Sequence, residues 1–255
     1  MGRVRRAWRR GQRRFLAYER VAVETRRATA IDMSTAYKAV ARAALPHARL
    51  AVDPFHTAQL GNKAVSDVRR RVSHQLRHRR RRATDPEYTI KDLLLWGPGT
   101  LSDRGRRCIL QTLTILEDLD GDTAHALRTA WNAKNLLLEL LALSPARTGL
   151  ATTRTDIDRH LTRFLDYCAT FGKDVPEVVT LAETISDWRN EIATALLLGI
   201  SNAAAEAVNR VTKLVYRTAF GLRNVPNQQR RASYAGSRST RPDWLPAATA
   251  HPNFG

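Results

Sequence analysis

Two aspartates follow short apolar runs in the N-terminal half of the chain. ATAI precedes Asp32, and RLAV precedes Asp53. A helical pattern between them, from Ser34 to about Leu45, predicts a strand–helix–strand crossover with parallel strands. Both carboxylates would then lie at the C-terminal edge of the sheet, where ligands and reacting groups gather in open α/β folds. Each aspartate alone is also typical of a helix cap or a turn, and His56 is typical of a partly buried, hydrogen-bonded histidine.

The last strongly periodic segment, from about Asn202 to Phe220, carries a third carboxylate, Glu206. Helical spacing places two sets of residues on opposite faces. The polar face holds Asn202, Glu206, Asn209 and Lys213, and the apolar face holds Ala204, Val208, Val211 and Val215. We expect the apolar face to pack on a core, with Ser201 as the helix cap. The alternative is an ordinary solvated face with a helix-favouring glutamate.

Arginine dominates the charge of the chain. The sequence has 42 Lys+Arg against 24 Asp+Glu, a formal net charge of +18 at pH 7. A compact protein with this charge needs a polyanion, most commonly nucleic acid. No apolar run is long enough to span a membrane. We predict phosphate contacts from arginines in residues 3–14 and 69–82, the second cluster being Arg69, Arg70, Arg71, Arg77, Arg79, Arg80, Arg81 and Arg82. A solvated, charged helix face is the alternative.

The elements that must position these residues are mostly helical. Helical patterns run over residues 57–82, 102–116, 122–143, 154–172 and 176–198. We therefore predict an α+β fold, predominantly α, in three segments. These are a basic N-terminal segment, 1–24; a domain over 25–225 with a helical insertion at about 70–180; and a flexible C-terminal tail, 226–255. Cys108 and Cys168 are far apart, which favours reduced thiols in a reducing cytoplasm.

Several separated motifs together resemble one family. An Asp-Met pair after a strand is followed by a helix ending in Leu-Pro-x-Ala, by Val-Asp-Pro-Phe-His, and by a basic helix. Downstream, GISNAAAEAVNRV at 199–211, DWRNEI at 187–192 and FGLRN at 220–224 continue the pattern. Over about residues 25–225, the chain resembles the DDE transposases of the insertion-sequence L-three (ISL3) group.

The resemblance implies a ribonuclease H-like fold, here partial with two parallel strands, a large helical insertion and a C-terminal catalytic helix. It implies carboxylates that hold two Mg²⁺ ions, with Mn²⁺ as a substitute, for in-line attack on phosphodiesters. By motif position, Asp32 matches the second carboxylate and Glu206 the third. Asp53 and His56 match a signature beside the site, and Asp53 as the second carboxylate is the alternative. Asn202, Asn209, Lys213 and Arg223 are expected to contact DNA.

Two departures from the family pattern bear on activity. Ala203 stands where the family has glycine after Ser-Asn, which matters if that position requires positive φ or close approach of DNA. The carboxylates before Asp32, Glu19 and Glu24, do not follow a convincing strand. We therefore expect the first carboxylate to be missing and the catalytic domain to be N-terminally truncated.

The expected function is DNA transposition by metal-dependent strand cleavage and transfer, in a catalytically incomplete protein. The expected partner is DNA, including transposon ends, in the bacterial cytoplasm at the nucleoid; a homo-oligomer is compatible with the sequence. The first alternative is a non-enzymatic nucleic-acid-binding helical protein, which would bind with a steep salt dependence and without cleavage. A basic partner-binding protein unrelated to nucleic acid is the second alternative.

Overall fold

The computed structural model describes residues 28–79, 82–201, 203–218 and 224–236. The chain divides into two compact units, Met1–Ser201 and Asn202–Gly255. Within the described residues, no helix has an apolar stretch long enough to cross a lipid bilayer.

The predicted strand–helix–strand unit is confirmed. β1 (Ala28–Ile31) and β2 (Arg49–Val52) pair in parallel, with Ala28 opposite Arg49 and Ile31 opposite Val52. α2 (Thr35–Ala44) connects them. β2 is buried because α10 (Arg189–Leu198) packs against it, and the α10 carboxylate of Glu191 forms an ion pair of 2.9 Å with Lys38 of α2. The sheet of the described residues therefore presents one C-terminal edge, where Asp32 and Asp53 follow the strands.

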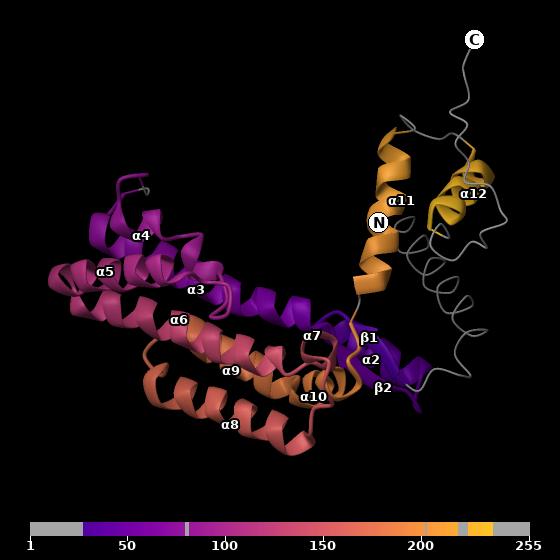
Figure 1. The fold of residues 1–255 in the computed structure, drawn as a ribbon, viewed down its shortest axis with the longest axis horizontal. Helices are drawn as coiled ribbons and strands as arrows, with labels where there is room; N and C mark the ends of the chain where they lie inside the picture. The colour runs from indigo at the N-terminus through magenta and orange to yellow at the C-terminus, as the bar shows by residue number, and fades with distance from the viewer. Residues whose placement is uncertain (1–27, 80–81, 202, 219–223, 237–255) are drawn as a thin grey trace, which may run out of the picture. The chain divides into compact units, whose positions relative to one another are not determined.

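A long helix, α3 (Pro54–Arg77), leads away from this edge towards α4 (Figure 1). It begins where it does because Asp53 caps it and Pro54 occupies the first turn. It ends at His78, which has left-handed backbone torsions (φ 46°). The predicted helix over 57–82 therefore starts and stops earlier than expected. The elements that follow are α4 (Pro86–Thr89), the 3₁₀ helix η1 (Leu93–Leu95), α5 (Asp103–Leu119), α6 (Gly121–Ala142), α7 (Pro145–Thr148) and α8 (Arg154–Phe171).

The core of this unit lies among α3, α5, α6, α8, α9 (Pro176–Asp187) and α10. It includes Val65, Leu127 and Phe164, all fully buried. The single helix predicted over 176–198 is in fact two, because the chain turns at the buried Trp188 (φ −104°, ψ 9°). Cys168 is a buried thiol, as predicted, and its burial raises its pKa to about 12.

Lys134 is fully buried in this core, on the face of α6 that packs against α3. Its Nζ donates hydrogen bonds of 2.6 Å to the carbonyl oxygens of Leu94 and Trp96, at the end of η1. Gly61 of α3 makes room for it, since a Cβ there would lie 3.1 Å from Lys134 Cγ. Burial lowers the pKa of Lys134 to about 8. Lys134 thus fastens the η1 connection to the bundle.

The second unit consists, in its described residues, of α11 (Ala203–Thr218) and α12 (Val225–Gly236), which pack against each other. Val208 near the start of α11 lies close to Gly236 at the end of α12, so the two helices are antiparallel. α12 includes residues 226–236 of the predicted tail. Its start has the signals of a helix N-terminus: the Asn224 side chain accepts a hydrogen bond from Asn227 N (3.4 Å), and Pro226 lies in the first turn.

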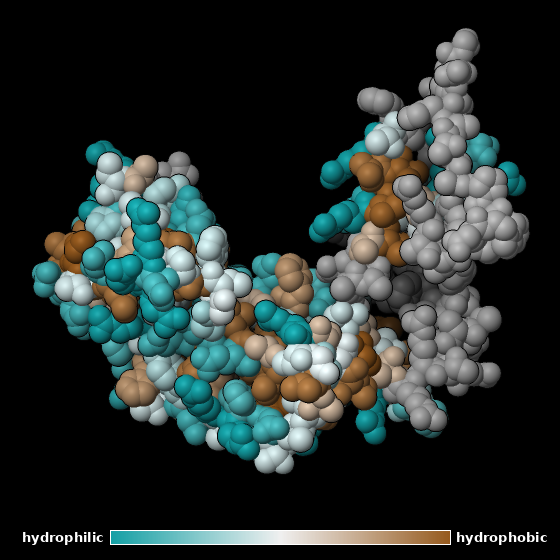
Figure 2. All heavy atoms as spheres, viewed as in Figure 1, coloured by the Kyte–Doolittle hydropathy of each residue, from teal (hydrophilic) through white to brown (hydrophobic). Residues whose placement is uncertain are grey.

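Apolar side chains remain exposed along α11 although α12 covers part of it. Figure 2 shows them on the side of this helix that faces the viewer. Val208 is 46% exposed and Leu214 58% exposed. The expectation that Val208 and its neighbours pack fully on a core is therefore not met within this unit, because one short helix is too narrow to bury the whole apolar stripe.

Candidate catalytic edge and nucleic-acid interface

Asp32 and His56 meet at the C-terminal edge of the sheet. Asp32 directly follows β1, and His56 lies in the first turn of α3, which directly follows β2. The two side chains form a contact of 3.1 Å between His56 Nε2 and Asp32 Oδ1. The Asp32 side chain is 54% exposed. The strand order that the sequence predicts thus brings together two of the four predicted catalytic residues.

Asp53 has a structural position at the same edge. It is 2% exposed, and its Oδ1 accepts a hydrogen bond of 3.1 Å from Phe55 N. This is the geometry of a helix N-cap, which satisfies an otherwise unpaired donor of the first turn. Asp53 therefore fixes the start of α3 and, with it, the place of His56. Its burial makes it a poorer candidate for binding a cation or DNA than Asp32.

The donor chemistry at this edge fits a hard divalent cation only in part. Asp32 offers an accessible carboxylate, the ligand type that Mg²⁺ prefers. Among the residues that the structure describes, however, no three His, Cys, Asp or Glu side chains come together as a metal site. The remaining candidate, Glu206, belongs to the second unit, in the first half of α11.

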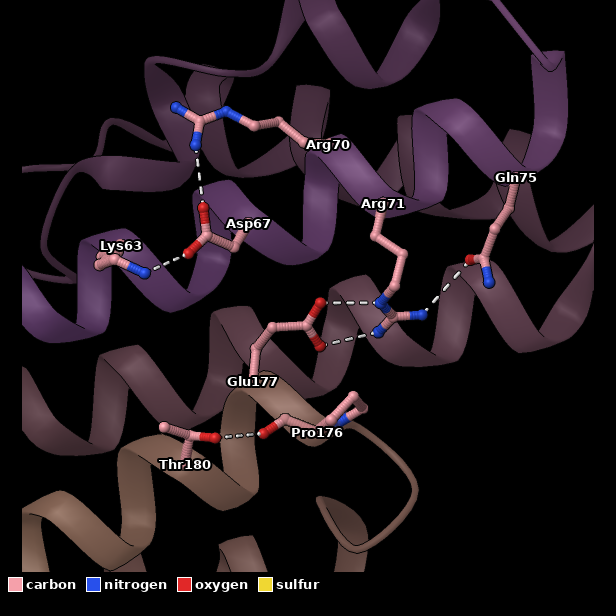
Figure 3. Close-up of polar contacts among 8 residues, drawn as sticks. All are labelled: Lys63, Asp67, Arg70, Arg71, Gln75, Pro176, Glu177 and Thr180. Carbon is pink, nitrogen blue, oxygen red and sulfur yellow. Dashed lines mark hydrogen bonds and ion pairs between the residues drawn. The ribbon is translucent and has the colours of Figure 1, made fainter.

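Arginines of α3 that we predicted to contact DNA are held by carboxylates of the same unit. Figure 3 shows Arg71 facing Glu177 of α9 with two parallel hydrogen bonds, 2.7 Å from Nε to Oε1 and 2.9 Å from Nη2 to Oε2. Arg70 donates to Asp67 at 2.9 Å. Bidentate pairs of this kind have geometric specificity, so Arg71 fastens α3 to α9.

Arginines at and just after the end of α3 are also paired with carboxylates of the same unit. Arg77 binds Glu87 through Nε (2.9 Å) and Nη2 (3.1 Å), and Glu87 is fully buried. Arg79 binds Asp85 through Nη2 (2.8 Å) and Nη1 (3.1 Å). Arg69 is only 6% exposed, so little of its side chain is accessible to a phosphate. Of this cluster, Arg82 is exposed, while Arg80 and Arg81 lie outside the described residues.

Asp85 organises the turn between α3 and α4. Hydrogen bonding from Arg79 and from the backbone N–H of Arg82 (2.6 Å) lowers the pKa of Asp85 to about 2, from an ordinary value of 3.8. A carboxylate with a lowered pKa in the folded state stabilises the fold where it is ionised, and loses this effect as the pH falls through its folded pKa. Here that window runs from about pH 4 to about pH 2.

We therefore expect Asp85→Asn to lower the midpoint of urea unfolding at pH 7. The difference from the wild type should shrink from pH 4 to pH 2, because Asp85 is then protonated in both the folded and the unfolded chain. Urea titrations of both proteins at a series of pH values measure this. Asp92→Asn, at an exposed carboxylate, is the matched control and should change little. A difference that is constant down to pH 2 would contradict the role of the Asp85 charge.

α11 carries a basic face in line with Glu206. Arg210, Lys213 and Arg217 follow Glu206 at intervals of four, seven and eleven residues, which places all of them on one side of a helix. The three basic side chains are exposed, as is Asn209, and none has a carboxylate partner among the described residues. Arg230 and Arg231 add to this charge from α12. The predicted contacts Asn202 and Arg223 lie outside the described residues.

The sequence prediction missed the acidic partners Asp85, Glu87 and Glu177, and it missed Arg210 and Arg217 as part of the basic face. Asp85 and Glu87 flank Pro86 just after the arginine run, so their local spacing was a usable signal. Glu177 is 106 residues from Arg71, and no local pattern connects them.

Comparison with known proteins gives one match. A transposase family model, that of the DDE transposases of the ISL3 type, matches residues 10–232. No curated protein and no solved structure matches the chain. The matched segment includes the Asp32–His56 edge, the helical bundle and α11 with Glu206. The chain therefore belongs to the ISL3-type DDE transposase family.

Proposed function

We propose that this transposase acts by metal-dependent cleavage of DNA and transfer of the cut strand, with Asp32 and Glu206 as the carboxylates that would hold a divalent cation. The observation that carries the proposal is the contact between the accessible Asp32 carboxylate and His56 at the edge of a parallel sheet. We further propose that this sheet belongs to a ribonuclease H-like core. The family supports this role, since transposases act on DNA.

The residues at the edge have distinct roles in this proposal. A bound Mg²⁺ would polarise the scissile phosphate and favour the attacking oxygen. Asp32 supplies a negatively charged oxygen, and His56, whose Nε2 lies 3.1 Å from Asp32 Oδ1, holds the orientation of its carboxylate. Asp53 holds the first turn of α3 and so positions His56 without contacting substrate. Glu206 of α11, which matches the third carboxylate of the family, would supply a further negatively charged oxygen.

DNA phosphates would lie along the basic face of α11 rather than along α3. Arg210, Lys213 and Arg217 are exposed and continue directly from the position of Glu206. Neighbouring cations concentrate the polyanion at the carboxylate and offset its repulsion of phosphate. By contrast, Arg71 and Arg77 of α3, and Arg79 just after it, already bind carboxylates.

We expect Lys213→Ala combined with Arg217→Ala to weaken binding of a mixed-sequence DNA duplex and to reduce its salt dependence. Each phosphate contact contributes about 0.9 to the magnitude of the slope of log K against log salt concentration. The slope of the double variant should therefore be smaller in magnitude by about 1.8. Fluorescence anisotropy at a series of salt concentrations measures the slope. Arg154→Ala with Arg159→Ala is the matched control, because both arginines are paired with aspartates on α8. Equal slopes for the two double variants would contradict the assignment of this face.

A non-enzymatic DNA-binding protein is the second candidate function. It is favoured by the exposed basic side chains of α11, which would bind DNA with or without a metal site. Incubating the full chain with plasmid DNA that carries the ends of the element, with Mg²⁺ or with a chelator, separates the two. Nicking that requires Mg²⁺ supports the proposed enzyme. Salt-dependent binding with no nicking under either condition favours the second candidate.

A further inference from the structure

A cavity within the helical bundle has the features of a ligand site. It has a volume of about 410 Å³ and lies among α5, α6, α8 and the connection after η1. This volume falls within the range of about 300–1,000 Å³ typical of small-molecule sites. All of its lining residues belong to the first unit, so the cavity does not depend on the placement of α11 and α12.

The α6 side of the cavity presents a buried donor and a buried acceptor without partners. Within the described residues, Trp131 Nε1 and Asn135 Oδ1 are both buried with no hydrogen-bond partner. Trp131 is only 8% exposed, and both residues line the cavity. They are four residues apart on one helix, so they lie on the same face. Buried polar groups are nearly always satisfied, so this donor and this acceptor are available to whatever occupies the cavity, a water molecule or a ligand.

The chemistry of the rim indicates which ligand. Arg106 lines the cavity from α5, is exposed, and has no carboxylate partner in the described part of the chain. Arg163 lines it from α8 and pairs with Glu139 at 3.2 Å. Tyr167 adds an aromatic side chain. A guanidinium and an aromatic ring around a donor–acceptor pair match a phosphate attached to a planar base.

We propose that this cavity binds a single unpaired nucleobase of DNA, with Trp131 Nε1 donating to the base edge and Asn135 Oδ1 accepting from it. Base edges present an acceptor and a donor side by side, as adenine does with N7 and N6. Arg106 contacts the phosphate of the same nucleotide. A base inside a duplex cannot enter a cavity in a helical bundle, so the ligand is a base that has left the stack. The inference rests on the proposed function, because it requires that the chain binds DNA.

The first test uses deoxyadenosine monophosphate alone and the full chain. The protein has five tryptophans, and the indole N–H resonance of Trp131 is assigned by its loss in Trp131→Phe. Adding the nucleotide is expected to shift this resonance and to leave the other indole resonances in place. Arg106→Ala, at an exposed position, is expected to weaken binding of the nucleotide several-fold. It should not change binding of deoxyadenosine, which lacks the phosphate. An unshifted Trp131 resonance at saturating nucleotide would overturn the proposal.

The second test compares a fully paired duplex with the same duplex carrying one unpaired adenosine. The wild-type chain is expected to prefer the unpaired site by about tenfold or more. Asn135→Leu should lose this preference while binding the paired duplex normally, and Asn190→Leu, at an exposed position, should keep it. A preference that survives in Asn135→Leu would overturn the nucleobase site. Failure of the wild type to bind either duplex would instead contradict the proposed DNA function. The nucleotide titration would then still test whether the cavity binds a nucleobase.

Discussion

Asp32→Asn and Glu206→Gln are each expected to reduce Mg²⁺-dependent DNA nicking by at least about 100-fold, with little change in DNA affinity. Each substitution keeps the shape of the side chain but removes the negative charge that a divalent cation requires. DNA affinity should hold because the proposed phosphate contacts are the exposed Arg210, Lys213 and Arg217, which neither substitution changes. Nicking rates and duplex affinities of the same preparations measure both effects.

Two controls make this result specific. Glu183→Gln makes the same change at an exposed position of α9 and should leave nicking unchanged. Asp53→Asn distinguishes the two candidate aspartates: asparagine is also a good helix cap, so this variant should keep most activity if Asp53 only positions α3. Loss of nicking in Asp53→Asn with full activity in Asp32→Asn would reverse the assignment. Full activity in Glu206→Gln would show that the Glu206 carboxylate is not part of the catalytic site.

Lys134→Ala is expected to lower the free energy of unfolding by about 3–5 kcal/mol. The carbonyl oxygens of Leu94 and Trp96 would lose their donor, at about 1–3 kcal/mol for a buried group left unsatisfied. Truncation of the side chain adds a cavity beside Gly61, where the contact is tight. Urea unfolding followed by circular dichroism measures the change.

Lys134→Met separates the two contributions, because methionine retains most of the packing and lacks the donor. It should be less destabilising than Lys134→Ala. The pKa of Lys134 is lowered to about 8 from 10.5, so the unfolded chain binds the extra proton between these values. The stability of the wild type relative to Lys134→Met should therefore rise with pH over this interval. A Lys134→Ala variant within about 1 kcal/mol of the wild type would contradict the role of Lys134.

The crossover unit could be predicted because its signals are local. Two apolar runs, a helical spacing between them, Pro46 after the first helix and Pro54 at the start of the next one define it without reference to the rest of the chain. The contact of Asp32 with His56 then follows from parallel pairing, since both residues come directly after paired strands.

Features that depend on distant parts of the chain could not be predicted in this way. The break between α9 and α10 occurs where Trp188 is buried, which is a property of tertiary packing. The sequence around Lys134 is compatible with a surface lysine, because its burial depends on the distant η1. The sequence around Arg71 is compatible with a phosphate contact, because its partner Glu177 is distant in the sequence. By contrast, Asn224 and Pro226 are local signals for the start of α12. The prediction of a flexible tail gave more weight to the polar composition of this segment than to these two residues.

The central claim is that the exposed Asp32 carboxylate binds a divalent cation at the edge of the sheet, and iron-directed cleavage of the protein tests it most directly. Fe²⁺ replaces Mg²⁺ at oxygen-rich sites, and with peroxide it generates hydroxyl radicals that break the nearest polypeptide backbone. If the claim is correct, mass spectrometry of the full chain will find breaks near residue 32. Excess Mg²⁺ will suppress these breaks, and Asp32→Asn will abolish them. The absence of breaks near residue 32, or breaks that Asp32→Asn leaves unchanged, would contradict the claim.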